Sequence, residues 1–363
     1  MTTSPMAAAS VFPASGSVDT RPEYAGAIAT WLFVVAALVF VMVVVGGATR
    51  LTGSGLSITE WQPIIGVIPP LTEADWKIAL EKYRQIPQYQ LVNKGMSLDA
   101  FKAIYWWEWG HRFLGRVIGL VFAVPLVFFI ARGAIRGRFA ARMGILFVLG
   151  GLQGVLGWYM VKSGLVDRTD VSQYRLAAHM TFASVLFAAL VWTALTVARE
   201  GRTEIRLHTL APGSRTLAAV VVAATFVQIF LGALVAGLKA GLTYNTWPLM
   251  DGRFVPNGLW TLEPWWRNLF ENVTTVQFDH RIGAYVLTAL VAVQVVRVLR
   301  TADDRAARRS ALALAFAVAV QVMIGIWTLL AVVPLSLALL HQAVAILVLG
   351  AAVWHAHAVF RRV

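Results

Sequence analysis

Residues 310–360 read SALALAFAVAVQVMIGIWTLLAVVPLSLALLHQAVAILVLGAAVWHAHAVF, a stretch of 51 residues without Asp, Glu, Lys or Arg. A helix needs about 20 apolar residues to cross a bilayer. The stretch is therefore long enough for two spans, which Pro334 divides. The composition agrees, because 58% of the 363 residues are apolar and only 13% are charged, whereas about a quarter are charged in a soluble domain. We predict an all-α integral membrane protein.

The charge and the absence of cysteine exclude several classes of function. The net charge of +13 would suggest nucleic-acid binding in a soluble protein, but between membrane spans basic residues report orientation. We therefore expect no nucleic-acid partner. The chain contains no Cys, which excludes disulfides, thiolate metal sites and cysteine nucleophiles. Any metal must be held by His, Met or oxygen.

The other uncharged intervals predict six further spans. Two of them, 117–131 and 282–296, have only 15 uncharged residues each, so their helices must take Arg112, Arg116 and Arg281 into the membrane. The eight predicted transmembrane helices are 28–48, 111–131, 143–161, 176–198, 216–236, 280–298, 311–333 and 336–358.

Basic residues between the spans predict the orientation. Four, four and five Lys or Arg residues lie in the short connections 132–142, 199–215 and 297–309. Cytoplasmic loops carry such an excess, so we expect both termini in the cytoplasm and the long connections 49–110 and 237–279 outside. The first residues lack a cleavable signal. We predict a multi-pass protein of a bacterial inner membrane.

The sequence contains an internal repeat. Shared glycines and tryptophans align the junctions that follow the first and fifth helices, and later motifs repeat in the same order. The aligned pairs are Gly46 with Gly232, Gly55 with Gly241, Trp61 with Trp247, His111 and Arg112 with His280 and Arg281, Gln153 and Gly157 with Gln321 and Gly325, and His179 with His341.

This repeat predicts two tandem, pseudo-symmetric four-helix bundles. The predicted units are a cytoplasmic tail 1–27, a first bundle 28–198 with a long outer loop 49–110, a cytoplasmic linker 199–216, a second bundle 217–358 and a cytoplasmic C-terminus 359–363.

Four histidines are predicted to share one depth, because each lies within the first turn or so of a helix that runs inward: His111, His179, His280 and His341. Neutral imidazole binds metals, and two helices of a bundle can hold a haem iron from both faces. Glycines that follow His111 leave room for a porphyrin, and Arg112, Arg116 and Arg281 are candidate partners for its propionates. A lone histidine at a helix end is more often an interfacial residue, but four at repeat-equivalent positions favour ligation.

Glu108 has no ionisable counterpart in the second half of the repeat. It precedes His111 by three residues, and its counterpart is Gln277, which cannot ionise. An acid beside only one metal site suggests proton chemistry there. The structural alternative is a carboxylate that pairs with Arg112 or Arg116, four and eight residues on.

The outer loop also contains TEADWKIALEKYRQI at residues 72–86, where Thr72 can cap towards Asp75. Its apolar spacing predicts an amphipathic helix on the outer face, either a lid over the first-half site or an interfacial anchor.

These motifs resemble those of the haem A synthase family, in its proteobacterial and mitochondrial branch. The resemblance covers about residues 31–357. It rests on the motifs GGATRLTGSGLSITEWQPIIG, EWGHRFLGR, LGGLQGVLGW, RLAAHMTFA, NTWPLMDG, QFDHRIGAY and LLHQA, which occur in the family's order. It implies oxidation of the methyl group on carbon 8 of haem O to a formyl group by two successive hydroxylations and loss of water. The product serves haem-copper terminal oxidases.

The resemblance also implies roles for single residues. Glu108 is the catalytic acid, His111 and His179 hold the substrate haem O, and His280 and His341 hold a haem b cofactor. Implied partners are a haem O synthase, assembly factors of the terminal oxidase, an unidentified electron acceptor and a second copy of the chain. Two alternatives stay open: a di-haem cytochrome b-type electron carrier, with equivalent halves, and a haem transporter or chaperone.

Overall fold

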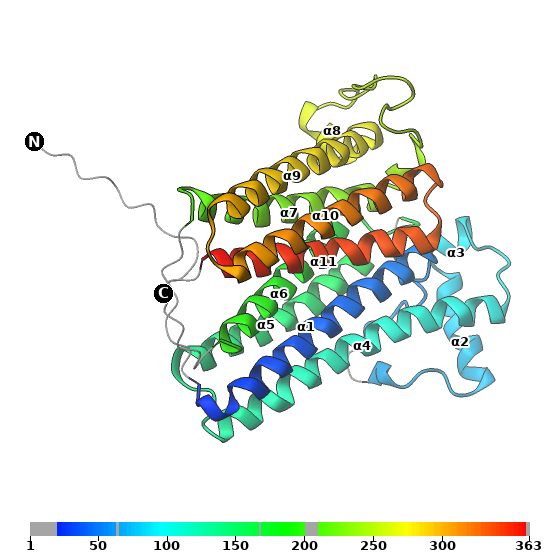
Figure 1. The fold of residues 1–363 in the computed structure, drawn as a ribbon. Coiled ribbons are helices and arrows are strands. Elements are labelled where there is room, and N and C mark those ends of the chain that lie inside the picture. Colours follow the sequence, from blue (N-terminus) through cyan, green and yellow to red (C-terminus); the bar gives the residue numbers. More distant parts are fainter. Residues whose placement is uncertain (1–19, 63–64, 167, 200–209, 361–363) are drawn as a thin grey trace, which may run out of the picture.

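The computed structural model describes residues 20–62, 65–166, 168–199 and 210–360. Within this part, eight helices are long and apolar enough to cross a membrane, and they lie side by side (Figure 1). The prediction of an all-α membrane protein with eight spans is confirmed. These helices are α1 (Pro22–Leu51), α4 (Leu98–Ala131), α5 (Gly137–Lys162), α6 (Gln173–Val197), α7 (Ser214–Gly237), α9 (Val273–Thr301), α10 (Arg305–Leu330) and α11 (Leu335–Val359).

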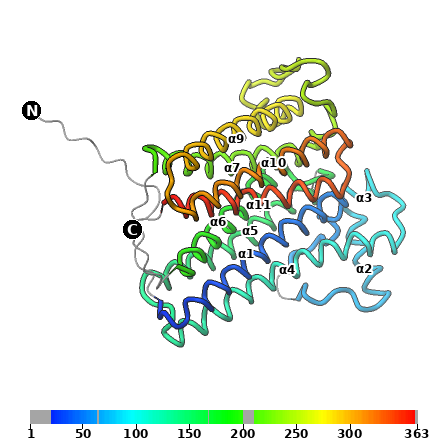
Figure 2. The backbone as a smooth tube through the Cα atoms, viewed as in Figure 1, coloured from blue at the N-terminus to red at the C-terminus, as the bar shows by residue number. Residues whose placement is uncertain are grey.

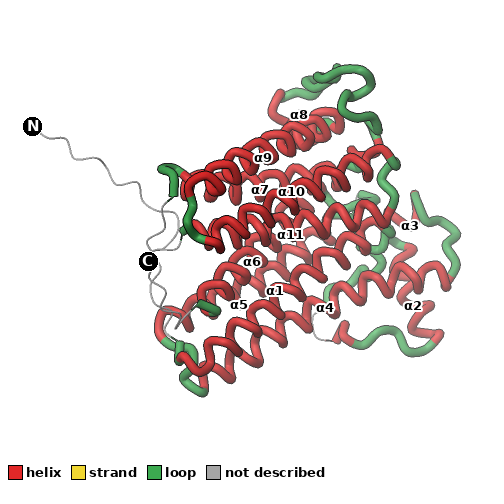
Figure 3. The backbone as a smooth tube through the Cα atoms, viewed as in Figure 1, coloured by secondary structure: helices red, strands yellow, loops and turns green. Residues whose placement is uncertain are grey.

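The connections gather at the two ends of these helices (Figure 3). The start of α1, the end of α11, and the α4–α5 and α9–α10 turns lie at one end (Figure 2). The opposite end carries the short helices α2 (Glu73–Arg84), α3 (Pro87–Leu91) and α8 (Asn268–Glu271). The longer connections therefore all lie on one side.

Two groups of four helices share the same pattern of contacts. In the first half, α1 and α5 each contact α4 and α6, and in the second half α7 and α10 each contact α9 and α11. The halves meet where α6 contacts α7 and where α11 contacts α1 and α6. The division into two pseudo-symmetric bundles, 28–198 and 217–358, stays a prediction.

The outer faces of the spans are apolar. Leu120 and Val124 on α4 and Phe316 on α10 are each more than 60% exposed. Lipid tails are as apolar as these side chains, so exposure to hydrocarbon carries no penalty of the kind that water would impose. This belt fits the assignment of the long helices as membrane spans.

Several helices begin earlier than the uncharged intervals predict. The helix predicted at 111 begins at Leu98, where the Ser97 hydroxyl accepts a hydrogen bond from the Ala100 N–H at 3.2 Å. The first helix begins at Pro22, so residues 22–27 of the predicted tail are helical. The reason is that an uncharged interval measures the hydrocarbon thickness, whereas a helix can continue into the polar region with its charged side chains in water.

The predicted amphipathic helix of the outer loop is confirmed as α2. Thr72 caps it, because the Thr72 hydroxyl accepts from the Asp75 N–H at 3.2 Å and the Asp75 carboxylate accepts from the Thr72 N–H at 3.0 Å. Hydrogen bonds from Thr72 lower the pKa of Asp75. Trp76 packs edge-on against Tyr105 of α4, with ring centroids 4.9 Å apart. α2 is therefore fastened to the part of α4 that precedes His111.

Candidate functional site

Each of the four histidines lies against a glycine of a neighbouring helix. A Cβ atom added at the glycine would lie 2.7–3.1 Å from an imidazole atom, closer than ordinary contact. The glycines therefore let each ring approach the backbone of the next helix. The pairs are Gly46 of α1 with His111 of α4, Gly157 of α5 with His179 of α6, Gly232 of α7 with His280 of α9, and Gly325 of α10 with His341 of α11.

The prediction that each histidine lies within the first turn or so of its helix was wrong for His111, which follows the start of α4 by 13 residues. His179, His280 and His341 follow the starts of their helices by six or seven residues. For α4, α6 and α9 the cause is the same as for the helix boundaries, because these helices begin before their uncharged segments do.

The structure brings His280 and His341 together. Their ring centroids are 6.4 Å apart and their planes lie at 82°. For metal–nitrogen bonds of about 2.0–2.1 Å, two imidazoles on opposite sides of one metal have centroids about 6.3 Å apart. The separation therefore fits a pair of axial ligands.

Glu108 lies in a hydrogen-bond network that joins α4 to the segment after α1, residues 52–62, which we call the outer junction of the first half. Its side chain is 2% exposed, and Oε2 accepts hydrogen bonds from the Ser57 hydroxyl and the Ile58 N–H, both at 2.8 Å. Oε1 accepts from Arg112 Nη2 at 2.6 Å. The ion pair with Arg112 is the structural alternative that the sequence left open.

Ser57 and Ile58 were missed as site residues in the sequence. They lie about 50 positions before Glu108, and no pattern in the sequence signals this contact. The second half differs, because the Gln277 amide instead donates to the Tyr244 carbonyl at 3.1 Å.

The three arginines bind the outer junctions through backbone carbonyls. Arg112 donates to the carbonyls of Ile58 and Glu60, and Arg116 donates to that of Gln62. Arg281 donates to Tyr244 and Thr246, while its Nε is buried without a partner among the described residues. These guanidinium groups therefore hold the loops in place, and Arg281 keeps one free donor.

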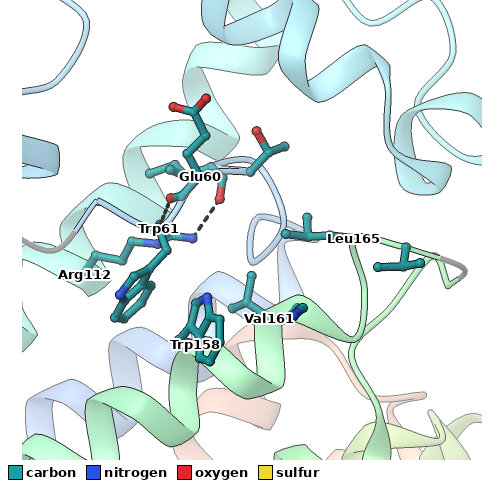
Figure 4. A pocket seen from close by; sticks show the side chains of 10 residues that line it. Glu60, Trp61, Arg112, Trp158, Val161 and Leu165 are labelled. Atoms are coloured by element: carbon teal, nitrogen blue, oxygen red, sulfur yellow. Dashed lines mark hydrogen bonds between the residues drawn. The ribbon is translucent and has the colours of Figure 1, made fainter.

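A cavity of about 300 Å³ lies beside Arg112, between the outer junction and the end of α5. Figure 4 shows Trp61 and Trp158 side by side in its lining, and their ring centroids are 6.3 Å apart. Arg112 lies 5.9 Å from the Trp61 centroid, and Lys162 lies 5.4 Å from that of Trp158. The lining thus combines two aromatic rings with two cations and the Glu60 carboxylate.

The sequence of this chain matches those of known proteins along most of its length. A sequence profile of the COX15-CtaA family, described as cytochrome oxidase assembly protein, matches residues 29–353. The chain belongs to this family. The haem A synthase of Parvibaculum lavamentivorans is 54% identical over 96% of this chain and 98% of its own length. Those of Azorhizobium caulinodans, at 54%, and Nitrosospira multiformis, at 50%, align with 91% and 92% of this chain and 93% and 94% of their own.

The contact between Gly157 and His179 gives a first prediction for this family member. The Gly157→Ala change puts a methyl group 3.0 Å from His179 Cε1, and such overpacking costs about 1–3 kcal/mol. Thermal unfolding in detergent is expected to show this loss. Gly154→Ala, on the same helix, meets nothing within 4 Å and is the matched control. Equal stability of the two variants would contradict the close ring contact.

Proposed function

We propose that this protein is a haem A synthase, which oxidises the methyl group on carbon 8 of haem O to a formyl group. The observation that carries the proposal is the 54% identity to haem A synthases along nearly the whole chain. The four histidines that the proposal needs are present, each against a glycine of a neighbouring helix. Two successive hydroxylations of the methyl carbon and loss of water give the formyl group.

We assign a haem b cofactor to His280 and His341 in the second half. Their ring centroids are 6.4 Å apart, and these two imidazoles would hold the haem iron. The buried Nε of Arg281 has no partner among the described residues and can donate to a propionate. When bound, haem b supplies one-electron transfer, and the chain positions it with two imidazoles from separate helices.

We assign the substrate haem O to His111 and His179 in the first half. The cavity of Figure 4 lies on this half, and its lining includes two indoles, two cations and the Glu60 carboxylate. The indoles suit the flat face of a porphyrin and the cations its propionates. Arg112 and Arg116 are the proposed propionate partners here. Their bonds to the junction carbonyls give these groups fixed positions.

Glu108 is the proposed catalytic acid. Two donors and the Arg112 guanidinium fix its carboxylate, one turn before His111. Such a group can take up or release protons as oxygen is inserted near it. The electron-carrier alternative requires equivalent halves, whereas Glu108 and Gln277 have different partners.

The proposed setting is the bacterial inner membrane with both termini in the cytoplasm. Its support is the placement of the basic turns and the two helix ends on one side (Figure 1). The proposed units are the two bundles 28–198 and 217–358, whose helices share one contact pattern. A haem O synthase and oxidase assembly factors are proposed partners, as is a second copy of the chain, and the family's description favours the oxidase connection.

Chromatography of extracted haems tests the function. In a host that makes haem O but no haem A, expression of this protein is expected to yield haem A or its hydroxylated precursor. The same host without the protein is the control. If haem O stays unconverted while the purified protein holds low-spin haem b and an electron acceptor is supplied, the electron carrier is the better account.

Glu108→Gln tests the catalytic acid. The amide can still accept from Ser57 and Ile58 but cannot transfer a proton, and such transfer contributes about 10²–10⁴-fold to a rate. We expect haem A formation to fall by that range while haem binding persists. Glu73→Gln, which removes an exposed carboxylate paired with Lys77, is the control. A Glu108→Gln protein that makes haem A at the normal rate would exclude Glu108 as a catalyst.

A further inference from the structure

A glutamine amide lies beside three of the four histidines. In each case the Gln Nε2 approaches the imidazole Nδ1 from the neighbouring helix, at 3.1 or 3.2 Å. The pairs are Gln153 with His179, Gln228 with His280 and Gln321 with His341. In the first two pairs the amide also donates to the histidine's own carbonyl, at 3.0 and 2.9 Å.

Each glutamine precedes, by four residues, the glycine that its histidine touches. The Gln and Gly of a pair therefore lie on the same face of their helix, one turn apart. The glycine lets the ring approach, and the glutamine meets its Nδ1. Gln228 was missed in the sequence, although it precedes Gly232 at the same spacing as the other two pairs.

The amides fix the position of each ring. The amide N–H of Gln153 and of Gln228 donates to the carbonyl of the same histidine whose ring it approaches, so a half-turn would place Oε1 against that carbonyl oxygen. Nε2 of Gln153 and of Gln321 also lies 3.4 Å from the Nε2 atom of its histidine. The three rings are therefore held from the side of the neighbouring helix, as outer-shell partners hold metal-ligating histidines.

His111 is the exception. The position four residues before Gly46 is Met42, whose Cε lies 3.4 Å from a Cβ built at Gly115, one turn beyond His111. Met42 thus faces the neighbouring helix α4 from the position that a glutamine occupies in the other three helix pairs. The His111 ring has no hydrogen bond within the part of the chain that the structure describes. A thioether donates no hydrogen bond and is at most a weak acceptor, so it cannot hold this ring in place as an amide does.

We propose that Gln153, Gln228 and Gln321 are positioning residues that hold three imidazole rings in place, and that His111 is the iron ligand that exchanges. This inference rests on the proposed ligation of two haems. A haem that only transfers electrons gains from two fixed ligands, and both second-half histidines have a glutamine. A substrate haem must enter and leave, and the first half has one fixed ligand, His179, and one free ligand.

The second half gives the first test. Protein purified from a host without haem O is expected to hold only haem b, and carbon monoxide binding to the reduced protein reports how often an axial ligand leaves. Gln228→Met places a methionine at the position that corresponds to Met42, four residues before the glycine. Loss of such an outer-shell partner typically costs 10–100-fold in metal affinity or activity. We expect Gln228→Met and Gln321→Met to bind carbon monoxide 10–100-fold faster than the unaltered protein.

Two further variants make the result specific. Gln228→Glu keeps the length of the side chain but replaces the amide N–H that donates to the His280 carbonyl with an oxygen, and is expected to speed carbon monoxide binding as Gln228→Met does. Gln294→Met makes the same substitution on α9, but Gln294 contacts His355 rather than a proposed ligand, so carbon monoxide binding should not change. Unaltered binding in both Gln228→Met and Gln321→Met would overturn the inference, as would equal acceleration in Gln294→Met.

The reverse change tests His111. Met42→Gln gives its ring an amide, so in haem O-loaded protein we expect carbon monoxide to bind the first-half haem about 10-fold more slowly, with a lower kcat and normal haem b content. An unchanged rate at normal haem b content would exclude His111 as the freer ligand. Retention of normal haem b after replacement of both His280 and His341 would instead refute the proposed ligation itself.

Discussion

The close approach of an imidazole ring to a glycine backbone recurs at four places, and the arrangement of the helices depends on it. A Cβ at any of these glycines would lie within 3.1 Å of a ring atom. The contact therefore fixes the spacing of four helix pairs, because side chains in a packed interior cannot shift without cost. It also contributes to the placement of His280 and His341, whose ring centroids are 6.4 Å apart.

Polar contacts at the outer end hold the junctions over these pairs. Guanidinium groups on α4 and α9 donate to backbone carbonyls of the junctions that follow α1 and α7. Among the described residues, the carboxylate that pairs with one of these arginines belongs to the first half, Glu108 with Arg112. The two halves share the contacts of the arginines and differ in this carboxylate, which supports the proposed division into a substrate half and an electron-transfer half.

The sequence predicted the eight spans because the exclusion of charge from hydrocarbon leaves a clear record in uncharged intervals. It did not predict where α4 begins. The part of this helix from Leu98 to His111 contains charged residues, so it does not belong to an uncharged interval. The histidines were identified by their repeat, and Gln153 and Gln321 were noted only as marks of it. Their contacts with imidazoles, and that of Ser57 with Glu108, depend on the packing of distant helices, which no local pattern records.

The central claim is that two pairs of histidines each hold one haem iron. Anomalous scattering at the iron edge, from crystals of protein purified with haem b and haem O, measures this directly. We expect two iron positions, one between His280 and His341 and one between His111 and His179, each about 2.0–2.1 Å from the ring nitrogens. Iron away from these rings in active protein, or a single position in protein that binds both haems, would contradict the account.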